Sequence, residues 1–298
     1  MTKIDLHIHS TNSDGELSPN AIIQRALKND VGLISITDHD IYYSHNYWKE
    51  IILNNKKIEM VPGVELSTDY FIDDEKVRIH LLAYDINDDN NELGQELLRM
   101  KNARQEGNIE YIKGLKKSLN FINDEMFSDF DFSQYGRIAK LIIKQLSTKT
   151  SLTLDQMKMV QNYVLTIKPK YNKCTLNIEQ GIEIVKANGG ITSFAHPYQT
   201  KLSYEKLDKL VGYLKSIGLD AIEAYHGDAT TGENDIAIFL AQKYGLSKSA
   251  GSDFHNPADS HDIGCDVSCY PCFTQGDVLS EKFKKEKRFL SNEETLER

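Results

Sequence analysis

The 298-residue sequence contains no apolar run that approaches the length of a membrane span. Its amino terminus enters a candidate strand directly, without the apolar core and cleavage site of a secretory signal. We therefore expect a cytoplasmic protein that has no membrane partner. With 40% hydrophobic and 27% charged residues, the chain also lacks the composition of a disordered protein, and it is long enough to bury a substantial core.

A surplus of positive charge is also missing, since the formal net charge is −9. An extended grip on duplex DNA requires a basic surface, so the composition argues against that partner. Small phosphorylated ligands remain compatible with an acidic chain, because bound divalent cations can supply the positive charge that the polypeptide lacks.

Cysteine is scarce, and the four in the chain are Cys174, Cys265, Cys269 and Cys272. They are too loosely spaced for a disulfide framework in a protein of this size. Cys269 and Cys272 form one C-x-x-C, but neither a second pair nor a nearby pair of histidines accompanies it. We interpret all four as ordinary thiols rather than as part of a zinc knuckle.

The opening strand and the turn after it, residues 4–15, read I-D-L-H-I-H-S-T-N-S-D-G. Successive side chains of a strand point to opposite faces, so His7 and His9 share one face and can hold the same ion. Asp14 follows in the turn, within reach of a second ion. A shared metal would also satisfy two imidazoles that an apolar strand otherwise leaves without partners.

Further apolar runs read as strands, and each has a histidine or a carboxylate at or near one end. They cover residues 33–36, 59–64, 76–84, 191–195, 220–225 and 246–250. Helical patterns alternate with them, beginning with a helix for which Ser18 and Pro19 are the start signals, and continuing at 178–188, 203–217 and 235–244. This alternation favours parallel βαβ units and an α/β barrel.

The pattern changes from about Asn91, where apolar residues recur at helical spacing among many charged ones. No comparable strand pattern appears before Gly190. We predict a mainly helical insertion domain at 93–175, with one helix near 135–146. The barrel would then have a first part at 1–92 and a second part at 176–298.

The polar residues at the strand ends form one candidate site, because the carboxyl ends of parallel barrel strands meet at one mouth. The set is His7, His9, Asp14, His39, Glu65, His80, His196, Asp253 and His255. Imidazole and carboxylate ligands without cysteine indicate zinc, manganese or iron rather than a thiolate site or calcium. Nine ligands suit two or three ions that share a bridging carboxylate, for which Glu65 is the candidate.

Such a centre is suited to hydrolysis of a phosphate ester. Two ions about 3.5–4 Å apart lower the pKa of a bridging water and clamp the attacking and leaving oxygens of an in-line displacement. We therefore predict a metal-dependent phosphoesterase that uses a hydroxide between the ions, with Glu65 and Asp253 among its catalytic residues. Neither a G-x-S-x-G elbow nor a Walker loop suggests another mechanism.

Seven motifs occur in order: D-L-H-I-H-S, S-D-G, T-D-H-D, P-G-V-E, H-L-L-A-Y, F-A-H-P and G-S-D-F-H. This series resembles the PHP (polymerase and histidinol phosphatase) superfamily over residues 1–90 and 176–257. The resemblance implies a distorted (β/α)7 barrel with a trinuclear metal site.

Transferred residue by residue, the resemblance implies three ion sites. One ion would be held by His7, His9, Glu65 and Asp253, a second by Glu65, His80 and His196, and a third by Asp14, His39 and His255. A carboxylate at position 14 and the helical insertion are similar to the branch of nucleotide and nucleoside 3′,5′-bisphosphate phosphatases. Some members of that branch also trim short RNA from its 5′ end, so a nucleotide and a short RNA are the expected partners.

Two further residues are candidates for substrate contact and catalysis. In that branch the insertion caps the active site and carries an Arg-x-His-like stretch, whereas residues 136–140 here read G-R-I-A-K. The arginine, Arg137, either binds the substrate phosphate bidentately or is a solvated residue at a helix start. His226, after E-A-Y, either contacts the phosphate, protonates the leaving group, or is an ordinary loop histidine.

Several alternatives stay open at the level of sequence. The substrate could be a non-nucleotide metabolite such as histidinol phosphate, the reaction could be of the amidohydrolase type, or the chain could be a metal-binding scaffold without turnover. Asp38 and Asp40 either orient the imidazole of His39 or are hydrogen-bonded loop carboxylates. The aromatic cluster around His45 either stacks a base or packs the helix, and we favour packing. His261 is interpreted as a loop residue rather than as a second site.

Overall fold

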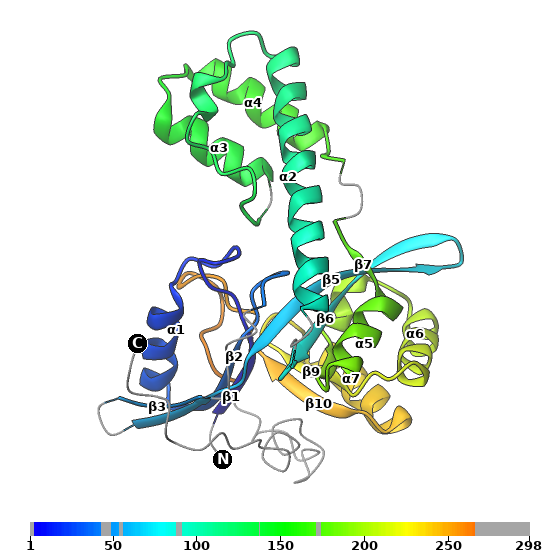
Figure 1. Cartoon of the computed structure of the whole chain (residues 1–298). Helices are drawn as coiled ribbons and strands as arrows, with labels where there is room; N and C mark the ends of the chain where they lie inside the picture. The colour runs from blue at the N-terminus through cyan, green and yellow to red at the C-terminus, as the bar shows by residue number, and fades with distance from the viewer. Residues whose placement is uncertain are drawn as a thin grey trace.

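The computed structural model describes residues 3–42, 49–53, 56–87, 91–136, 138–170 and 174–265 (Figure 1). It is a mixed α/β fold built on two sheets. In spatial order, the first sheet contains β1 (Lys3–Ile8), β2 (Val31–Ile36), β4 (Lys56–Met60) and β3 (Lys49–Leu53). The second contains β10 (Ser247–Gly251), β9 (Ala221–His226), β8 (Ile191–Phe194), β6 (Glu75–Tyr84), β5 (Gly63–Ile72) and β7 (Leu176–Asn177).

Backbone contacts join the two sheets on both sides of the candidate site. On one side, Ile8 bridges to Phe254, and the N–H of Asp253 donates to the carbonyl oxygen of His7 at 2.9 Å. On the other, His39 bridges to Glu65. The two sheets thus form one distorted barrel, as expected, and the candidate ligands lie where the sheets meet.

The parallel βαβ units expected from the alternation are present in only part of the two sheets. Strands β5 and β6 are antiparallel, and so are the pairs β6–β8 and β3–β4. Only Asp73 and Asp74, both with positive φ, separate β5 from β6, so this connection is a hairpin and leaves no room for a crossover helix. The strand expected at 59–64 is also two strands, because β4 ends at Met60 and β5 begins after Pro62, which has no N–H to donate.

Helices cover the outer faces of the sheets, and their starts follow capping signals. Helix α1 (Pro19–Lys28) begins after Ser18, whose side chain accepts from the N–H of Ala21, as its sequence predicted. Helix α7 (Thr231–Tyr244) begins before the expected residue 235, because Thr230 and Glu233 form a capping box. The other barrel helices are α5 (Ile178–Ala187), η2 (Pro197–Thr200) and α6 (Tyr204–Ser216).

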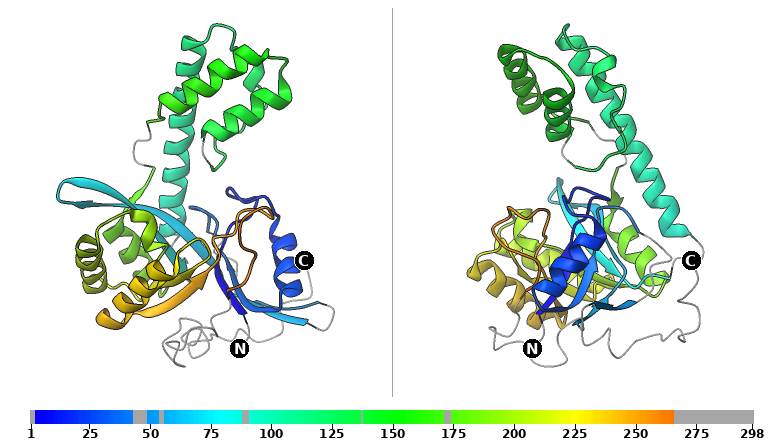
Figure 2. Two further views of the ribbon diagram at one scale, coloured as in Figure 1. Left: turned by 180° about the vertical axis from the view of Figure 1, so that it is seen from behind. Right: turned by 90° about the vertical axis from the view of Figure 1, so that its left-hand side faces the viewer.

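The segment 93–175, for which we predicted a helical insertion, is helical throughout most of its described part. It contains α2 (Glu92–Ser118), η1 (Glu125–Phe127), α3 (Ile138–Lys149) and α4 (Leu154–Thr166). We did not predict α4, although Thr153 and Gln156 form the capping box that marks its start. Figures 1 and 2 show this segment standing on one side of the sheets, with α3 and α4 beside the distal half of α2.

The long helix α2 contributes to two separate hydrophobic cores. Leu93, Leu97 and Met100 belong to the core of the barrel. Tyr111 and Ile112, farther along the helix, belong to a second core that α3 and α4 complete. A continuous helix therefore ties the insertion to the barrel.

Among the helices of the described ranges, none combines the length and the apolar character that crossing a bilayer requires.

Candidate metal centre

The loop after β1 is closed by the carboxylate of Asp38. This carboxylate accepts from the Ser10 N–H at 2.7 Å, and from the hydroxyls of Ser10 and Ser13 at 2.6 Å each. Asp38 is thus a hydrogen-bonded loop carboxylate, which is one of the two roles that the sequence allowed it. A Cβ at Gly15 would lie 2.2 Å from the carbonyl oxygen of His9, so the tight return of this loop requires glycine.

All nine residues that we predicted as metal ligands lie in one cluster. Their ligand atoms form four overlapping groups, within each of which every atom lies within 4.8 Å of the others. The groups are His9, Asp14, His39 and His255; His7, Glu65 and His196; His39, Glu65 and His80; and His7, His226 and Asp253. Sequence reasoning had placed nine of these ten residues in the metal site, and had given His226 another role.

Five distances among four ligand atoms near the end of β1 match the spacing of a tetrahedral ion site. His9 Nε2 lies 3.2 Å from both His7 Nε2 and Glu65 Oε2, and 3.1 Å from Asp253 Oδ1. His7 Nε2 lies 3.4 Å from each of the same two oxygens. Ligands placed tetrahedrally at about 2.0–2.1 Å from an ion are roughly 3.3–3.4 Å apart, so these residues fit a divalent cation.

Glu65 is fully buried and directs its two oxygens to different histidines. Oε1 lies 2.7 Å from His80 Nδ1 and 2.9 Å from His196 Nε2. Oε2 lies 2.9 Å from His39 Nδ1, yet both of these atoms are buried and neither makes a hydrogen bond. Polar atoms that face each other without a hydrogen bond are costly unless a third partner satisfies both, as a shared ion would.

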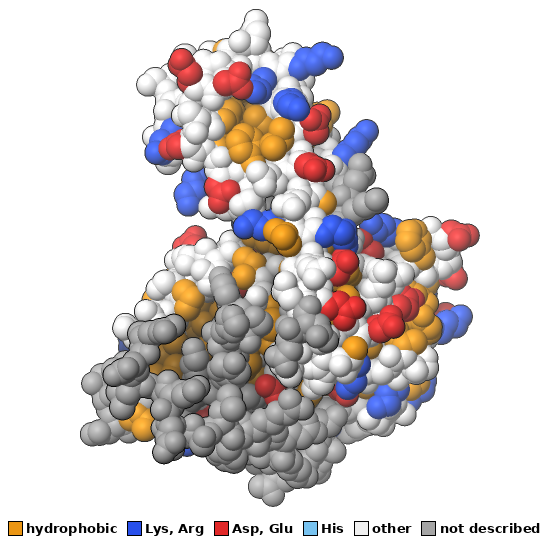
Figure 3. Space-filling view, in the orientation of Figure 1, with side chains coloured by type: hydrophobic (Ala, Val, Ile, Leu, Met, Phe, Trp, Pro, Cys, Tyr) orange, Lys and Arg blue, Asp and Glu red, His pale blue; other side chains and the backbone are white. Residues whose placement is uncertain are grey.

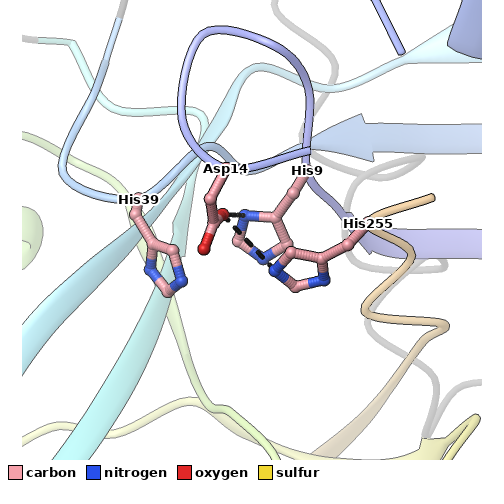
Figure 4. A group of neighbouring side chains, drawn as sticks. All are labelled: His9, Asp14, His39 and His255. Carbon is pink, nitrogen blue, oxygen red and sulfur yellow. Dashed lines mark ion pairs between the residues drawn. The ribbon is translucent and has the colours of Figure 1, made fainter. Parts of the chain in front are cut away.

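Asp14 forms the other end of the cluster (Figure 4). Its Oδ1 lies 3.3 Å from His255 Nε2 and 3.6 Å from His9 Nδ1, and His39 faces it from another segment of the chain. This oxygen is also buried without a hydrogen bond. The donor set and its unsatisfied atoms therefore fit divalent metal here as well.

The cluster has strongly shifted pKa values. Burial alone would lower the pKa of His9, but the carboxylates of Asp253 and Glu65 outweigh burial and raise it to about 10. Burial would raise the pKa of Glu65, but the neighbouring imidazoles, His39 first, hold it well below its ordinary value. These groups interact as one charged network, as expected of a functional site.

Sequence reasoning missed Glu223, a buried carboxylate in the middle of β9. Its Oε1 accepts from His7 Nδ1 at 3.0 Å, and its Oε2 accepts from the N–H of His196 at 2.6 Å. A proton on His7 Nδ1 leaves Nε2 free to bind an ion, so Glu223 orients one candidate ligand and positions the backbone of another. The signal was present in the sequence as a lone carboxylate within the apolar run A-I-E-A-Y.

His226 is bonded in a different way from the other histidines. The N–H of Asp228 donates to His226 Nδ1 at 3.1 Å, and the Tyr198 hydroxyl lies 3.2 Å from the same nitrogen. Because Nδ1 accepts, the neutral ring carries its proton on Nε2, which lies 3.3 Å from Asp253 Oδ2. In this tautomer Nε2 is a hydrogen-bond donor and has no lone pair for an ion.

The remaining sequence candidates have separate outcomes. The Asp40 carboxylate accepts hydrogen bonds from the Tyr135 hydroxyl and the Ser67 N–H, and it forms an ion pair with Arg104. Like Asp38, it is therefore a hydrogen-bonded loop carboxylate rather than a residue that orients an imidazole. His261 lies in a loop, as we interpreted it from the sequence, and its Nδ1 is 3.2 Å from Asp228 Oδ1. Arg137, His45, Cys269 and Cys272 lie outside the described residues.

The loop after β1 and the insertion approach each other at Gly136. A Cβ on Gly136 would lie 3.6 Å from the Cβ of Asp14, so the chain immediately before Arg137 reaches the candidate ligands. The role of Arg137 itself stays a prediction.

Known proteins similar to this chain cover nearly its whole length. The 5′-3′ exoribonuclease Rnm of Escherichia coli is 29% identical over 265 residues, which span 87% of each chain. A 3′,5′-nucleoside bisphosphate phosphatase of Chromobacterium violaceum is 25% identical over 276 residues, which span 89% of this chain and 91% of the relative.

A solved amidohydrolase from Chromobacterium violaceum shares the fold, with a TM-score of 0.67 at 23% identity over 91% of this chain and 93% of that one. The PHP domain family matches residues 5–189, which include most of β1, the loop after it, strand β5 with Glu65, and the insertion. The ordered motifs, the distorted barrel and this match agree, and the chain belongs to the PHP domain family.

Proposed function

We propose that this protein is a metal-dependent phosphoesterase that hydrolyses a small phosphate monoester of a nucleotide or nucleoside 3′,5′-bisphosphate. The observation that carries the proposal is the cluster of nine imidazole and carboxylate ligands around the buried Glu65. Ions bound there would supply an activated water and would neutralise charge on the attacking and leaving oxygens.

The side chains of the protein contribute three further functions. His7, His9, Glu65 and Asp253 would hold one ion, and Glu223 keeps His7 Nε2 free to bind it. His226 presents its Nε2–H beside Asp253, where it can donate to an oxygen of the substrate or of the leaving group. In this proposal Arg137, which follows Gly136 in the sequence, binds the substrate phosphate.

A nucleotide substrate is supported by the two relatives, one of which is named for nucleoside bisphosphates and the other for RNA. Both substrates offer a phosphate ester next to a ribose. Short 5′-phosphorylated RNA is therefore the second candidate, and exoribonuclease activity would use the same centre. A non-nucleotide phosphate ester and an amide are the alternatives that the test must separate.

The test uses protein reconstituted with Mn²⁺, Zn²⁺ or Fe²⁺. It measures inorganic phosphate released from the phosphate monoesters, and it measures product formation by chromatography for the RNA, the lactone and the amide. The panel contains mononucleotides, 3′,5′-bisphosphates, 5′-phosphorylated RNA, histidinol phosphate, and a lactone and an amide. Preferred release from one nucleotide class supports the proposal. Turnover confined to the lactone or amide, or metal binding without any turnover, would overturn it.

A further inference from the structure

A polar cluster joins helix α2 to the candidate metal centre and has no part in the function proposed above. It consists of Arg104, on α2, with Tyr135, before α3, and Asp40, after β2. Arg104 Nη2 donates to the Tyr135 hydroxyl at 2.5 Å and lies 3.3 Å from Asp40 Oδ2. The Tyr135 hydroxyl in turn donates to the same Asp40 oxygen.

Tyr135 also connects this cluster to a candidate metal ligand. Its ring stacks on the imidazole of His39, with centroids 5.1 Å apart and planes 13° from parallel. The guanidinium carbon of Arg104 lies 3.8 Å from the centroid of the Tyr135 ring, as in a cation–π contact. A positive charge is therefore held one aromatic ring away from the metal centre.

Asp40 is a rigid support for this arrangement. Its backbone has a φ of +51°, and its Oδ1 accepts from the N–H of Ser67 at 2.7 Å. Its side chain is 4% exposed and that of Arg104 is 12% exposed. The guanidinium thus has a fixed orientation before substrate arrives, and fixed orientation lowers the entropy lost on binding an anion.

We propose that Arg104 binds a second, non-reacting phosphate group of the substrate, and that Tyr135 and Asp40 are positioning residues for its guanidinium. The inference rests on the proposed function, because the reacting phosphate is taken to lie on the ions. A planar guanidinium suits the fork of phosphate oxygens better than an ammonium does. The second phosphate of a 3′,5′-bisphosphate and the next phosphate of a short RNA offer the same chemistry.

The kinetic test compares substrates that do and do not carry the second phosphate. For Arg104→Met, kcat/KM should fall about 10- to 100-fold with adenosine 3′,5′-bisphosphate, the effect of losing a charged hydrogen bond. With p-nitrophenyl phosphate it should change by less than about threefold. Arg99→Met, on the same helix and paired with Glu96, is the matched control and should leave both substrates unchanged.

Two further arms refine the assignment. Arg104→Lys should restore only part of the loss, since an ammonium lacks the planar fork. A 5′-phosphorylated dinucleotide identifies the source of the second phosphate: if Arg104→Met impairs it as well, both substrates use this arginine. Equal losses on the bisphosphate and on p-nitrophenyl phosphate, or no loss on either, would overturn the inference.

Binding provides a readout that does not depend on turnover. The bisphosphonate analogue of adenosine 3′,5′-bisphosphate, which is not hydrolysed, is titrated calorimetrically into metal-loaded wild type and Arg104→Met. We expect at least about tenfold weaker binding to the variant at equal metal content. Equal affinity would contradict the role of Arg104, whereas absence of turnover in the wild type would contradict the proposed function alone.

Discussion

At the scale of single residues, Glu65 organises the candidate centre because its two oxygens face different sets of histidines. Its position after P-G-V in the sequence marked it as a ligand and as the candidate bridge between two ions, and the structure adds which imidazoles face each oxygen. A carboxylate in this position can join two ions through its two oxygens, whereas a neutral imidazole has only one nitrogen with a free lone pair.

Glu65→Gln should therefore lose metal and activity together. The amide keeps the volume of the side chain but supplies a single oxygen and no charge, so phosphate release should fall by at least about 1,000-fold. Metal content measured by mass spectrometry should fall with it. Glu75→Gln, at the exposed start of β6, is the control, and a Glu65 variant with full metal content and activity would refute the assignment.

Glu223 should act through His7 rather than on the substrate. In Glu223→Gln a single amide oxygen must replace two carboxylate oxygens that accept from His7 and from the N–H of His196. We expect metal affinity to weaken about 10- to 100-fold while the fold is retained. Competition with a chromogenic chelator measures the affinity, and saturating metal should restore most of the activity. Undiminished metal affinity in this variant would contradict the role of Glu223 in orienting His7.

Metal binding should strengthen as pH rises. In the metal-free protein the pKa of His9 is raised to about 10, so its charged form stabilises the fold fully below its ordinary value of 6.5, and this contribution is lost as pH rises toward 10. An ion must displace that proton. Between pH 6 and 8 the affinity should rise about tenfold per unit for each proton released. Calorimetry in buffers of different ionisation enthalpy counts the protons, and a count of zero would contradict this account.

At the scale of elements, the helical segment is distinguished from the barrel by its own hydrophobic core, to which α2, α3 and α4 contribute. Helical periodicity predicted α2 and most of α3. It did not predict α4, because its apolar positions are interrupted by polar residues and several of its large side chains, such as Leu154, are exposed.

Ile142→Ala should loosen the insertion and leave the metal centre in place. Ile142 is fully buried in the insertion core, so the truncation should cost about 3 kcal/mol of local stability. Hydrogen exchange should speed up in α3 and α4 but not in β1 or β9, and metal content should be unchanged. Leu154→Ala, at a side chain that is 72% exposed, should have little effect. Loss of metal from Ile142→Ala would show that the insertion and the barrel unfold together.

Parallel alternation of strands and helices predicted the barrel, but not the hairpin between β5 and β6. The hairpin reverses the direction of β6 and so brings His80, in its interior, beside Glu65 of the preceding strand. His80 is therefore not at the carboxyl end of a parallel strand. Instead, the antiparallel register of β5 and β6, which the two-residue turn fixes, places His80 beside Glu65.

At the scale of the whole molecule, the metal centre links segments from both sheets and should stabilise them together. Ions at a thousandfold excess over their dissociation constant would add about 4 kcal/mol to the free energy of unfolding. The Tm should therefore rise by about 10 °C relative to protein treated with a chelator. Glu65→Gln is the control and should show almost no metal-dependent shift. A wild-type Tm that does not change when metal is added would contradict a metal centre that links the two sheets.

The charge distribution agrees with a small phosphorylated partner. On the face shown in Figure 3, acidic and basic side chains are interspersed over the insertion rather than gathered into a basic stripe. The net charge of −9 points the same way. Under the proposed function, recognition of phosphate depends on bound ions and on individual arginines at the site.

The sequence by itself determined the family, the α/β fold class and the identity of nine candidate ligands. Strand periodicity places His7 and His9 on one face whatever the rest of the chain does, and ordered motifs identify the later ligands. Only the tertiary structure decided which atoms meet. Glu223 and His7 are 216 residues apart, and their contact exists only because β9 and β1 close around the same site. The tautomer of His226 and the position of Arg104 depend in the same way on backbone and side-chain partners that the fold supplies.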